Sequence, residues 1–143
     1  MRFDDQVGHL EFTAPYSTQV RNSVLQASAN CGISIVDGGV YAIFQGPRFE
    51  TPAEIDRIDR DGGDVVGMTG MPEAALAAEL NMCYACINLI VNPAAGRSPV
   101  QISFGEIKEA QKKGCEDLNV LLKETLQILA SVREIVPETK VFR

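Results

Sequence analysis

The sequence predicts an α/β protein with parallel strands. Two apolar, β-branched runs, residues 64–68 and 83–91, are separated by a helix-forming stretch of roughly ten residues. Glycine and proline interrupt the chain where strands and helices would end. A strand, a helix and a second strand make a βαβ unit, and such units build parallel sheets. The length of 143 residues suits one domain around one hydrophobic core.

Composition and charge exclude several function classes. Hydrophobic residues make up 45% and charged residues 22% of the chain, as in ordinary globular proteins. The net charge of −6 argues against a surface for nucleic acid or anionic membrane. No apolar run approaches the roughly 20 residues needed to cross a bilayer, and the segment MRFDDQVGHLEF lacks the apolar core of a signal peptide. We expect a cytoplasmic protein without nucleic-acid or membrane partners.

The four cysteines raise the question of a metal or redox site. Cys83 and Cys86 form a C-x-x-C motif, but they lie in a strand-like run where an offset of three puts side chains on opposite faces. Neither a second such motif nor a nearby histidine completes a zinc set. We expect buried structural thiols in a reducing compartment, and no metal.

The first part of the chain predicts one helix and two extended segments. Residues 16–30 have apolar residues at helical spacing, and Ser17 or Thr18 can cap that helix. Residues 33–37 and 40–45 alternate apolar and polar residues around a Gly-Gly pair. This pattern predicts either two extended segments or a hairpin.

The next helix has a clear start signal. Thr51 can cap it, Pro52 suits the first turn and Glu54 completes a capping box. We expect this helix to run to about Arg60, before an Asp-Gly-Gly stop. Pro72-Glu73 opens a further helix.

Two apolar strands and one long helix complete the expected fold. Residues 64–68 are predicted as a short buried strand, and residues 83–91 as a fully apolar one. Ser103 and Glu106 form a second capping box, which opens a helix that reaches about Val132. Its leucines recur at helical spacing, so it is expected to cover one face of the sheet.

Ligands of open parallel sheets bind beyond the carboxyl ends of the strands. This rule selects residues 45–50, 68–71 and 92–96, which chain order brings to one crevice. Thr69 precedes a helix start, so its hydroxyl either helps to bind an anion or caps the helix. Asn92 carries an amide that suits a purine edge, or it starts a turn before proline.

The Gly-Pro turn of the first loop holds an aromatic and a carboxylate side by side. Phe49 offers a flat face for a heterocycle and Glu50 a carboxylate for a ring N–H. Taken alone, Phe49 is more typical of a core and Glu50 of a solvated helix start. Arg48 balances Glu50, binds an anion or lies at the surface. The sole histidine, His9, is typical of a structural or exposed position.

Three stretches carry a specific resemblance: GPRFETPAE, DVVGMTGMPEAALAAE and VNPAAG. In order and spacing they resemble the signatures of the trimeric purine nucleoside phosphorylase and methylthioadenosine phosphorylase family, over about Val7 to about Val132. The resemblance implies a three-layer, phosphorylase/hydrolase-like α/β fold with a mostly parallel or mixed sheet, and a homotrimer. It implies phosphorolysis of a purine nucleoside to the base and ribose 1-phosphate, with inorganic phosphate as co-substrate and no cofactor.

The resemblance assigns roles to matched positions. Phe49 falls on the aromatic that packs against the base, and Glu50 on the carboxylate that binds the purine N1–H. Asn92 falls on the residue that bonds N7 and O6 and stabilises the departing base, which is the catalytic role. Met68 falls on the methionine under the ribose, and Thr69 on the hydroxyl that contacts phosphate.

Three further positions bear on the sugar. His9 falls on a lid position that reaches into the neighbouring subunit's site. Phe104 aligns with a histidine that binds the 5′-hydroxyl, and Ile107 lies one turn further on. An apolar pair suits a methylthio group, because burying an unpaired hydroxyl costs about 1–3 kcal/mol.

The base and sugar positions together indicate 5′-methylthioinosine as substrate, split to hypoxanthine and 5-methylthioribose 1-phosphate. Methylthioadenosine-specific members of the family carry Ser and Asp where Glu50 and Asn92 stand, so this pair resembles the 6-oxopurine enzymes. Methylthioadenosine and inosine or guanosine are the alternative substrates.

The resemblance covers only the C-terminal half of the family's domain. The N-terminal half contributes a Gly-rich loop and an Arg-His pair to phosphate binding, and the sequence contains neither. We therefore expect residues 1–143 to be the C-terminal half of one phosphorylase domain, with a sheet incomplete on the N-terminal side and exposed apolar edges. We expect no substantial phosphorolysis by this chain alone. The competing hypotheses are a water-using nucleosidase and a non-catalytic purine-binding or oligomer-forming module.

Overall fold

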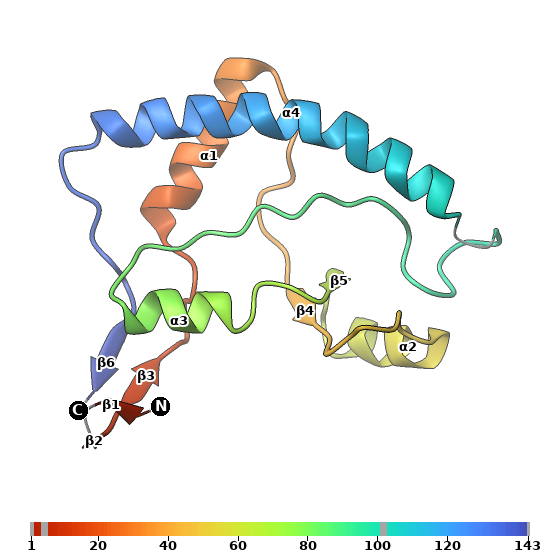
Figure 1. Cartoon of the computed structure of the whole chain (residues 1–143), viewed down its shortest axis with the longest axis horizontal. Coiled ribbons are helices and arrows are strands. Elements are labelled where there is room, and N and C mark those ends of the chain that lie inside the picture. Colours follow the sequence, from red (N-terminus) through yellow and green to blue (C-terminus); the bar gives the residue numbers. More distant parts are fainter. Residues whose placement is uncertain (1, 4–5, 101–102, 143) are drawn as a thin grey trace.

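The computed structural model describes residues 2–3, 6–100 and 103–142. It confirms an α/β fold with the expected helices. Helix α4 (Phe104–Ser131) runs along one side of the molecule, and α1 (Thr18–Cys31) packs across it (Figure 1). The long connection after α3 (Glu73–Glu79) passes between α4 and α3, so helices lie on both sides of it (Figure 1).

The hydrophobic core lies between α1 and α4. Ala27 is fully buried and Leu121 is 2% exposed, and both pack with Val24. The Ser17 hydroxyl accepts a hydrogen bond from the amide of Val20, so Ser17 is the cap of α1. The α1–α4 packing therefore joins two segments that lie about a hundred residues apart in the sequence.

The C-terminal segment after α4 is hydrogen-bonded to the start of α1. The Glu138 carboxylate accepts hydrogen bonds from the Thr18 amide at 2.6 Å and from the Thr18 hydroxyl at 3.0 Å. Gln19 donates to the carbonyl of Glu134 and accepts from the amide of Val136. Strand β3 (His9–Glu11) pairs antiparallel with β6 (Lys140–Phe142), so these two strands, far apart in the sequence, lie at one end of the molecule (Figure 1).

A parallel strand pair and its crossover helix lie at the other end of the molecule. Strand β4 (Tyr41–Ile43) pairs with β5 (Val65–Gly67), and α2 (Pro52–Arg60) connects them. The capping box of Thr51 and Glu54 is present at the start of α2, as predicted. This unit is a βαβ crossover, and it occurs one helix earlier in the chain than the sequence predicts.

One predicted strand is absent, and one of two alternatives for another region is ruled out. In the described chain, residues 83–91 form no strand, and a hollow lined by β5 and by Ile87–Ile90 lies where the two segments face each other. For residues 33–37 and 40–45 the hairpin alternative is wrong, because β4 pairs with β5. The other alternative, two separate extended segments, is not contradicted, and the second segment contains β4. The strand at 64–68 is present as β5, but it is half-buried rather than buried, since one of its edges faces the hollow.

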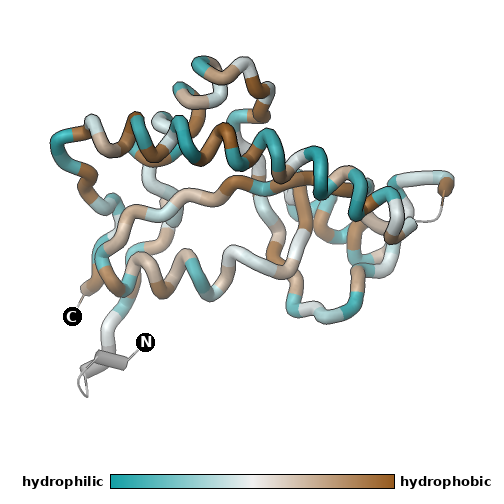
Figure 2. The backbone as a smooth tube through the Cα atoms, turned by 45° about the horizontal axis from the view of Figure 1, so that its top comes forward, coloured by the Kyte–Doolittle hydropathy of each residue, from teal (hydrophilic) through white to brown (hydrophobic). Residues whose placement is uncertain are grey.

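The 83–91 segment is held by scattered contacts instead of a strand ladder. The amide of Ser17 donates to the Tyr84 carbonyl at 2.7 Å, and the rings of Tyr16 and Tyr84 stack. Leu89 packs against Gly114 of α4, where a larger residue would clash with it. Figure 2 shows this segment as a largely hydrophobic stretch below α4. The Ile90 side chain is 61% exposed, so exposed apolar surface is present as expected.

The remaining elements follow the sequence closely. Helix α3 begins directly after Pro72, as predicted. Helix α4 is capped by Ser103, whose hydroxyl accepts from the Gly105 amide, so a simple cap takes the place of the expected capping box. The short strands β1 (Arg2–Phe3) and β2 (Gln6–Val7) pair antiparallel.

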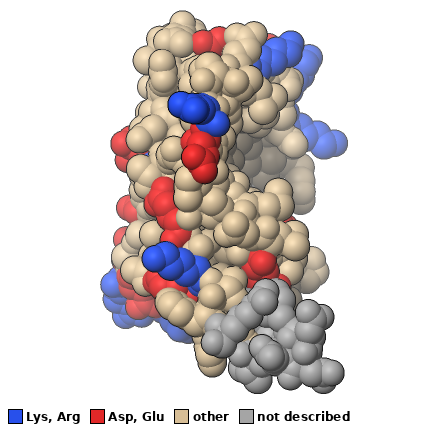
Figure 3. Space-filling view, turned by 90° about the vertical axis from the view of Figure 1, so that its left-hand side faces the viewer, with Lys and Arg blue, Asp and Glu red and all other residues tan. Residues whose placement is uncertain are grey.

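Charges are mixed on the surface. Acidic and basic side chains are interspersed on the face shown in Figure 3. Within the described ranges, no helix combines the length and the apolar character that a membrane crossing requires.

Candidate functional site

The three predicted loops lie next to one another around the start of α2. Gly46 has a φ of +61° and leaves room for Met68, because a Cβ at Gly46 would lie 2.6 Å from the Met68 sulfur. Gly96 has a φ of +75° and lies against Pro52, where a Cβ would approach the proline Cβ to 2.8 Å. The loops beginning at residues 45, 68 and 92 therefore share one region, at the carboxyl ends of β4 and β5.

Thr69 is held by Tyr41. The two hydroxyl oxygens lie 3.2 Å apart, and the Thr69 amide donates to the tyrosine oxygen at 3.3 Å. Helix α3 starts at Pro72 without a side-chain cap, so the interpretation of Thr69 as a helix cap is wrong. The role of Thr69 in anion binding stays a prediction. No sequence pattern points to Tyr41, because its contact with Thr69 spans 28 residues.

Thr69 and Met68 line an open hollow of about 260 Å³. Its other walls are Tyr41, strand β5 and residues 87–90. The volume is slightly below the lower end of ligand pockets, about 300 Å³. Its polar edge is the Tyr41–Thr69 pair, and Phe49, Glu50 and Asn92 are not among its lining residues.

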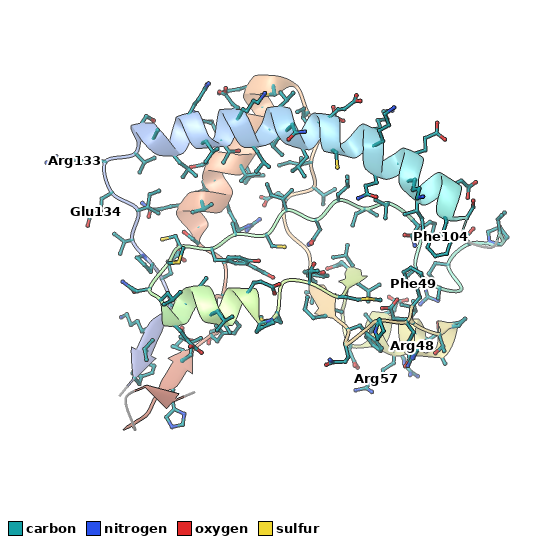
Figure 4. The ribbon with its side chains drawn as sticks, in the orientation of Figure 1. Arg48, Phe49, Arg57, Phe104, Arg133 and Glu134 are labelled. Carbon is teal, nitrogen blue, oxygen red and sulfur yellow. The ribbon has the colours of Figure 1, made fainter. Side chains whose placement is uncertain are left out.

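Phe49 and Phe104 form an aromatic pair at the surface. Their ring centroids lie 6.4 Å apart with a tilt of 49°, and Figure 4 shows the two rings facing each other from the first loop and the start of α4. Phe49 is 54% exposed, so its interpretation as a core residue is wrong. Ile107, one turn beyond Phe104, is half-buried, and so is Glu50. The structure thus brings the predicted base-side and sugar-side aromatics together.

Asn92 is half-buried and bonds within its own loop. Its side-chain amide donates to the Pro93 carbonyl at 2.7 Å, which fits the turn-forming interpretation. The Arg97 amide closes the next turn onto the Ala94 carbonyl at 3.0 Å. The role of Asn92 at a purine edge stays a prediction.

Arg48 bonds to α2 rather than to Glu50. Its guanidinium donates to both carboxylate oxygens of Glu54, at 2.7 and 2.8 Å, and to the Phe49 carbonyl at 3.0 Å. The hydrogen bonds from Arg48, with that from the Thr51 amide, lower the pKa of Glu54 to about 2. Arg48 is exposed, as one alternative predicted. Its hydrogen bonds to Glu54 are the main cause of its raised pKa, and the negative charge of Glu50 adds to this effect without a direct bond.

Arg97 was missed by the sequence interpretation. It donates to Asp56 at 2.7 Å and to Asp59 at 2.9 Å, and the bond to Asp56 above all raises the pKa of the guanidinium. Two aspartates at i and i+3 on one helix face could have signalled such a partner.

His9 does not join these residues within one chain. It is exposed on β3, at the opposite end of the molecule from α2 (Figure 1). Its predicted reach into a neighbouring subunit stays a prediction.

The cysteines show no sign of a metal or redox centre in the described chain. All four are free thiols and half-buried, less buried than expected. Burial raises the pKa of the Cys86 thiol, and the negative charge of Glu73 raises it further. Among the described residues, no group of His, Cys, Asp or Glu side chains could hold a metal ion.

Comparison with known proteins identifies the family. Residues 2–127 match the phosphorylase superfamily. A probable S-methyl-5′-thioinosine phosphorylase of Pseudomonas syringae pv. tomato is 50% identical over 122 residues, covering 85% of this chain and 50% of that protein. A 6-oxopurine nucleoside phosphorylase of Pyrococcus furiosus is 41% identical over 127 residues, covering 89% of this chain and 48% of that protein.

A solved structure shows the same fold. The methylthioadenosine phosphorylase of Schistosoma mansoni, in complex with adenine, superimposes with a TM-score of 0.84 at 22% identity. The match covers 92% of this chain and 53% of that one. The chain thus spans about half the length of the relatives that it matches. With its sequence match and its fold in agreement, the chain belongs to the phosphorylase superfamily.

Proposed function

We propose that this chain carries the base and ribose side of a purine nucleoside phosphorylase whose substrate is 5′-methylthioinosine. The reaction transfers the methylthioribosyl group from hypoxanthine to inorganic phosphate. The observation that carries the proposal is the meeting of the three predicted loops, 45–50, 68–71 and 92–96, around Gly46, Met68, Pro52 and Gly96. Relatives named for S-methyl-5′-thioinosine and for 6-oxopurine nucleosides support the substrate class.

Base recognition rests on Glu50 and Asn92. A 6-oxopurine carries an N1–H that a carboxylate accepts, whereas N1 of adenine is itself an acceptor and would face the Glu50 carboxylate unfavourably. Asn92 would have to turn its amide from the Pro93 carbonyl to the purine edge. As the C–N bond breaks, negative charge develops on the purine. The Asn92 side-chain N–H would donate a hydrogen bond to the purine edge and stabilise this charge, while the Glu50 carboxylate accepts from N1–H and holds the base in place.

The sugar and phosphate would lie on either side of Met68. Phe104 and Ile107 provide apolar surface for the methylthio group, next to the Phe49 ring. Thr69 would contact phosphate at the polar edge of the hollow, where Tyr41 already holds its hydroxyl. The phosphate dianion would stabilise the positive charge on the sugar and then attack it.

Calorimetry with the purified chain tests base recognition. We expect hypoxanthine to bind at least about tenfold more tightly than adenine, since a mispaired polar group costs about 1–3 kcal/mol. Glu50→Gln and Asn92→Ala should remove most of this preference. Asn119→Ala, an exposed asparagine of α4, is the matched control and should keep it.

Two further measurements separate the alternatives. Binding of methylthioinosine that strengthens with phosphate supports the phosphorylase, whereas base binding without any phosphate effect supports a purine-binding module. Turnover that is independent of phosphate would instead indicate a nucleosidase. Equal binding of adenine and hypoxanthine would refute the assignment of Glu50.

The proposal includes a homotrimer in the cytoplasm, in which His9 reaches the site of a neighbouring subunit. This arrangement is supported by the exposure of His9 at the end of the molecule away from α2. Light scattering gives the oligomeric state, and a monomeric chain whose base affinity is unaffected by His9→Ala would contradict it.

A further inference from the structure

Helix α2 touches two of the three loops of the candidate site, and it does so through arginines that come from the loops themselves. Arg97 follows the 92–96 loop and Arg48 lies in the 45–50 loop. Figure 4 shows Arg48 beside α2 together with Arg57, an arginine of the helix itself. Neither Arg48 nor Arg97 has a role in the chemistry proposed above.

Arg97 attaches the end of the 92–96 loop to two side chains of α2. Its two guanidinium nitrogens bond to carboxylates one helical turn apart, Asp56 and Asp59. Next to it, Gly96 lies so close to Pro52 that no side chain would fit between them without a shift. The loop is therefore held against the helix by both a polar and a steric contact.

The short connection between Asn92 and Arg97 couples the positions of these two residues. Only four residues separate Asn92 from Arg97, and two hydrogen bonds, from the Asn92 amide to Pro93 and from the Arg97 amide to Ala94, stiffen the connection. A shift of the arginine end would consequently move the asparagine side chain.

The same helix fixes the Phe49–Glu50 loop through Arg48. The forked contact with Glu54 and the bond to the Phe49 carbonyl place the backbone just before Glu50. Glu54 also closes the capping box with Thr51, so the first turn of α2 and the loop share one carboxylate. The two side chains proposed to bind the base thus take their relative position from one helix.

The ion pairs of Arg97 are too exposed to contribute much to stability, so their main effect is to position the loop. Arg97 remains 37% exposed, and its two aspartates are 58% and 70% exposed. Exposed ion pairs of this kind contribute little to the free energy of unfolding. A binding group, by contrast, loses most of its effect when displaced by about 1 Å.

We propose that Arg97 is a positioning residue for base specificity: through Asp56 and Asp59 it sets the distance of Asn92 from the Glu50 loop on the shared platform of α2. The effect on base affinity rests on the function proposed above. The contacts of Arg97 with Asp56 and Asp59, here called the clamp, do not depend on that function and can be tested without a ligand.

The experiment compares Arg97→Ala and Arg97→Lys with a matched control, Arg57→Ala. Arg57 lies on the same helix and pairs with Asp61 at 3.5 Å, but this pair is contained within α2 and its end, and holds neither loop. For each variant we would measure the hypoxanthine dissociation constant, the denaturation midpoint, and amide hydrogen exchange of residues 92–97.

We expect Arg97→Ala to weaken hypoxanthine binding about tenfold, the effect of one lost hydrogen bond, and to speed exchange of the backbone amide at position 97. Its denaturation midpoint should stay close to that of the wild type. Arg97→Lys should recover part of the affinity, since a single ammonium lacks the planar fork that reaches both aspartates. Arg57→Ala should change neither binding nor exchange at 92–97.

Three results would overturn the inference: wild-type affinity in Arg97→Ala, an equal loss in Arg57→Ala, or unchanged exchange at residues 92–97. If the wild-type chain does not bind hypoxanthine, the proposed function fails. The exchange comparison between Arg97→Ala and Arg57→Ala then still decides whether the clamp exists.

Discussion

The two ends of this molecule are held together by different forces. Between α1 and α4 the contacts are apolar and buried, with Leu121 and Ala27 almost inaccessible to solvent. Around α2 only Ile55 of the helix is a buried hydrophobic residue, and the loops are attached by ion pairs. The difference teaches that stability and site geometry are separable here: one end supplies the free energy of folding, and the other sets where the candidate site residues lie.

The largest effect that would sharpen this comparison is expected in the core. Leu121→Ala should lower the free energy of unfolding by about 2–5 kcal/mol, because it removes buried methyl groups and leaves a cavity. Chemical denaturation measures the loss. Leu126→Ala, on the same helix but with a side chain 65% exposed, should change it by no more than about 0.5 kcal/mol. Equal losses in both variants would contradict the position of the core.

An intermediate effect is expected where the tail meets α1. Glu138→Gln keeps an oxygen acceptor for Thr18 but removes the negative charge at a helix N-terminus, so the free energy of unfolding should fall by about 0.5–1 kcal/mol. The loss should shrink at high salt because the charge is screened. Glu134→Gln is the control, since Glu134 bonds Gln19 through its backbone carbonyl alone. A similar loss in that control would show that the charge of Glu138 has no specific role.

The smallest effect on stability, and the most local, is expected at α2. The pKa of Glu54 is about 2 in the folded chain and 4.5 in the unfolded one. The contribution of Glu54 to the free energy of unfolding is therefore complete above pH 4.5 and is lost as the pH falls toward 2. Titration of the Glu54 carboxyl by NMR measures the folded pKa. Arg48→Ala should raise it toward 4.5, whereas Arg57→Ala should leave it unchanged. If the pKa of Glu54 did not respond to the loss of Arg48, the contact between Arg48 and Glu54 would not hold the 45–50 loop as inferred.

Local signals in the sequence were sufficient for the helices. Each of these signals is local: the capping box at Thr51 and the stop after Arg60 each involve residues no more than four positions apart. The structure has both. The strand predicted at 83–91 failed for the opposite reason. An apolar run becomes a strand only beside a partner, and within the described residues β5 pairs with β4 and no strand pairs with residues 83–91.

The candidate site was predictable in outline and not in its contacts. The three loops selected from the sequence lie together in the structure. The rule on strand ends holds for the two that follow β4 and β5, whereas the loop at 92–96 follows a segment that forms no strand. Arg97 reaches Asp56 across 41 residues and Tyr41 reaches Thr69 across 28, and no spacing pattern in the sequence encodes such partners.

The bond between Thr18 and Glu138 has a consequence for the order of folding. It joins residues 120 positions apart, and closing a loop of that length costs about 4 kcal/mol of chain entropy, more than the bond returns. The tail must therefore attach after other contacts have brought the ends together. On a ribosome that adds about 5–20 residues per second, α1 waits roughly 6–24 seconds for Glu138. Through that interval its 14 residues, a marginal length for an isolated helix, depend on the rest of the nascent chain.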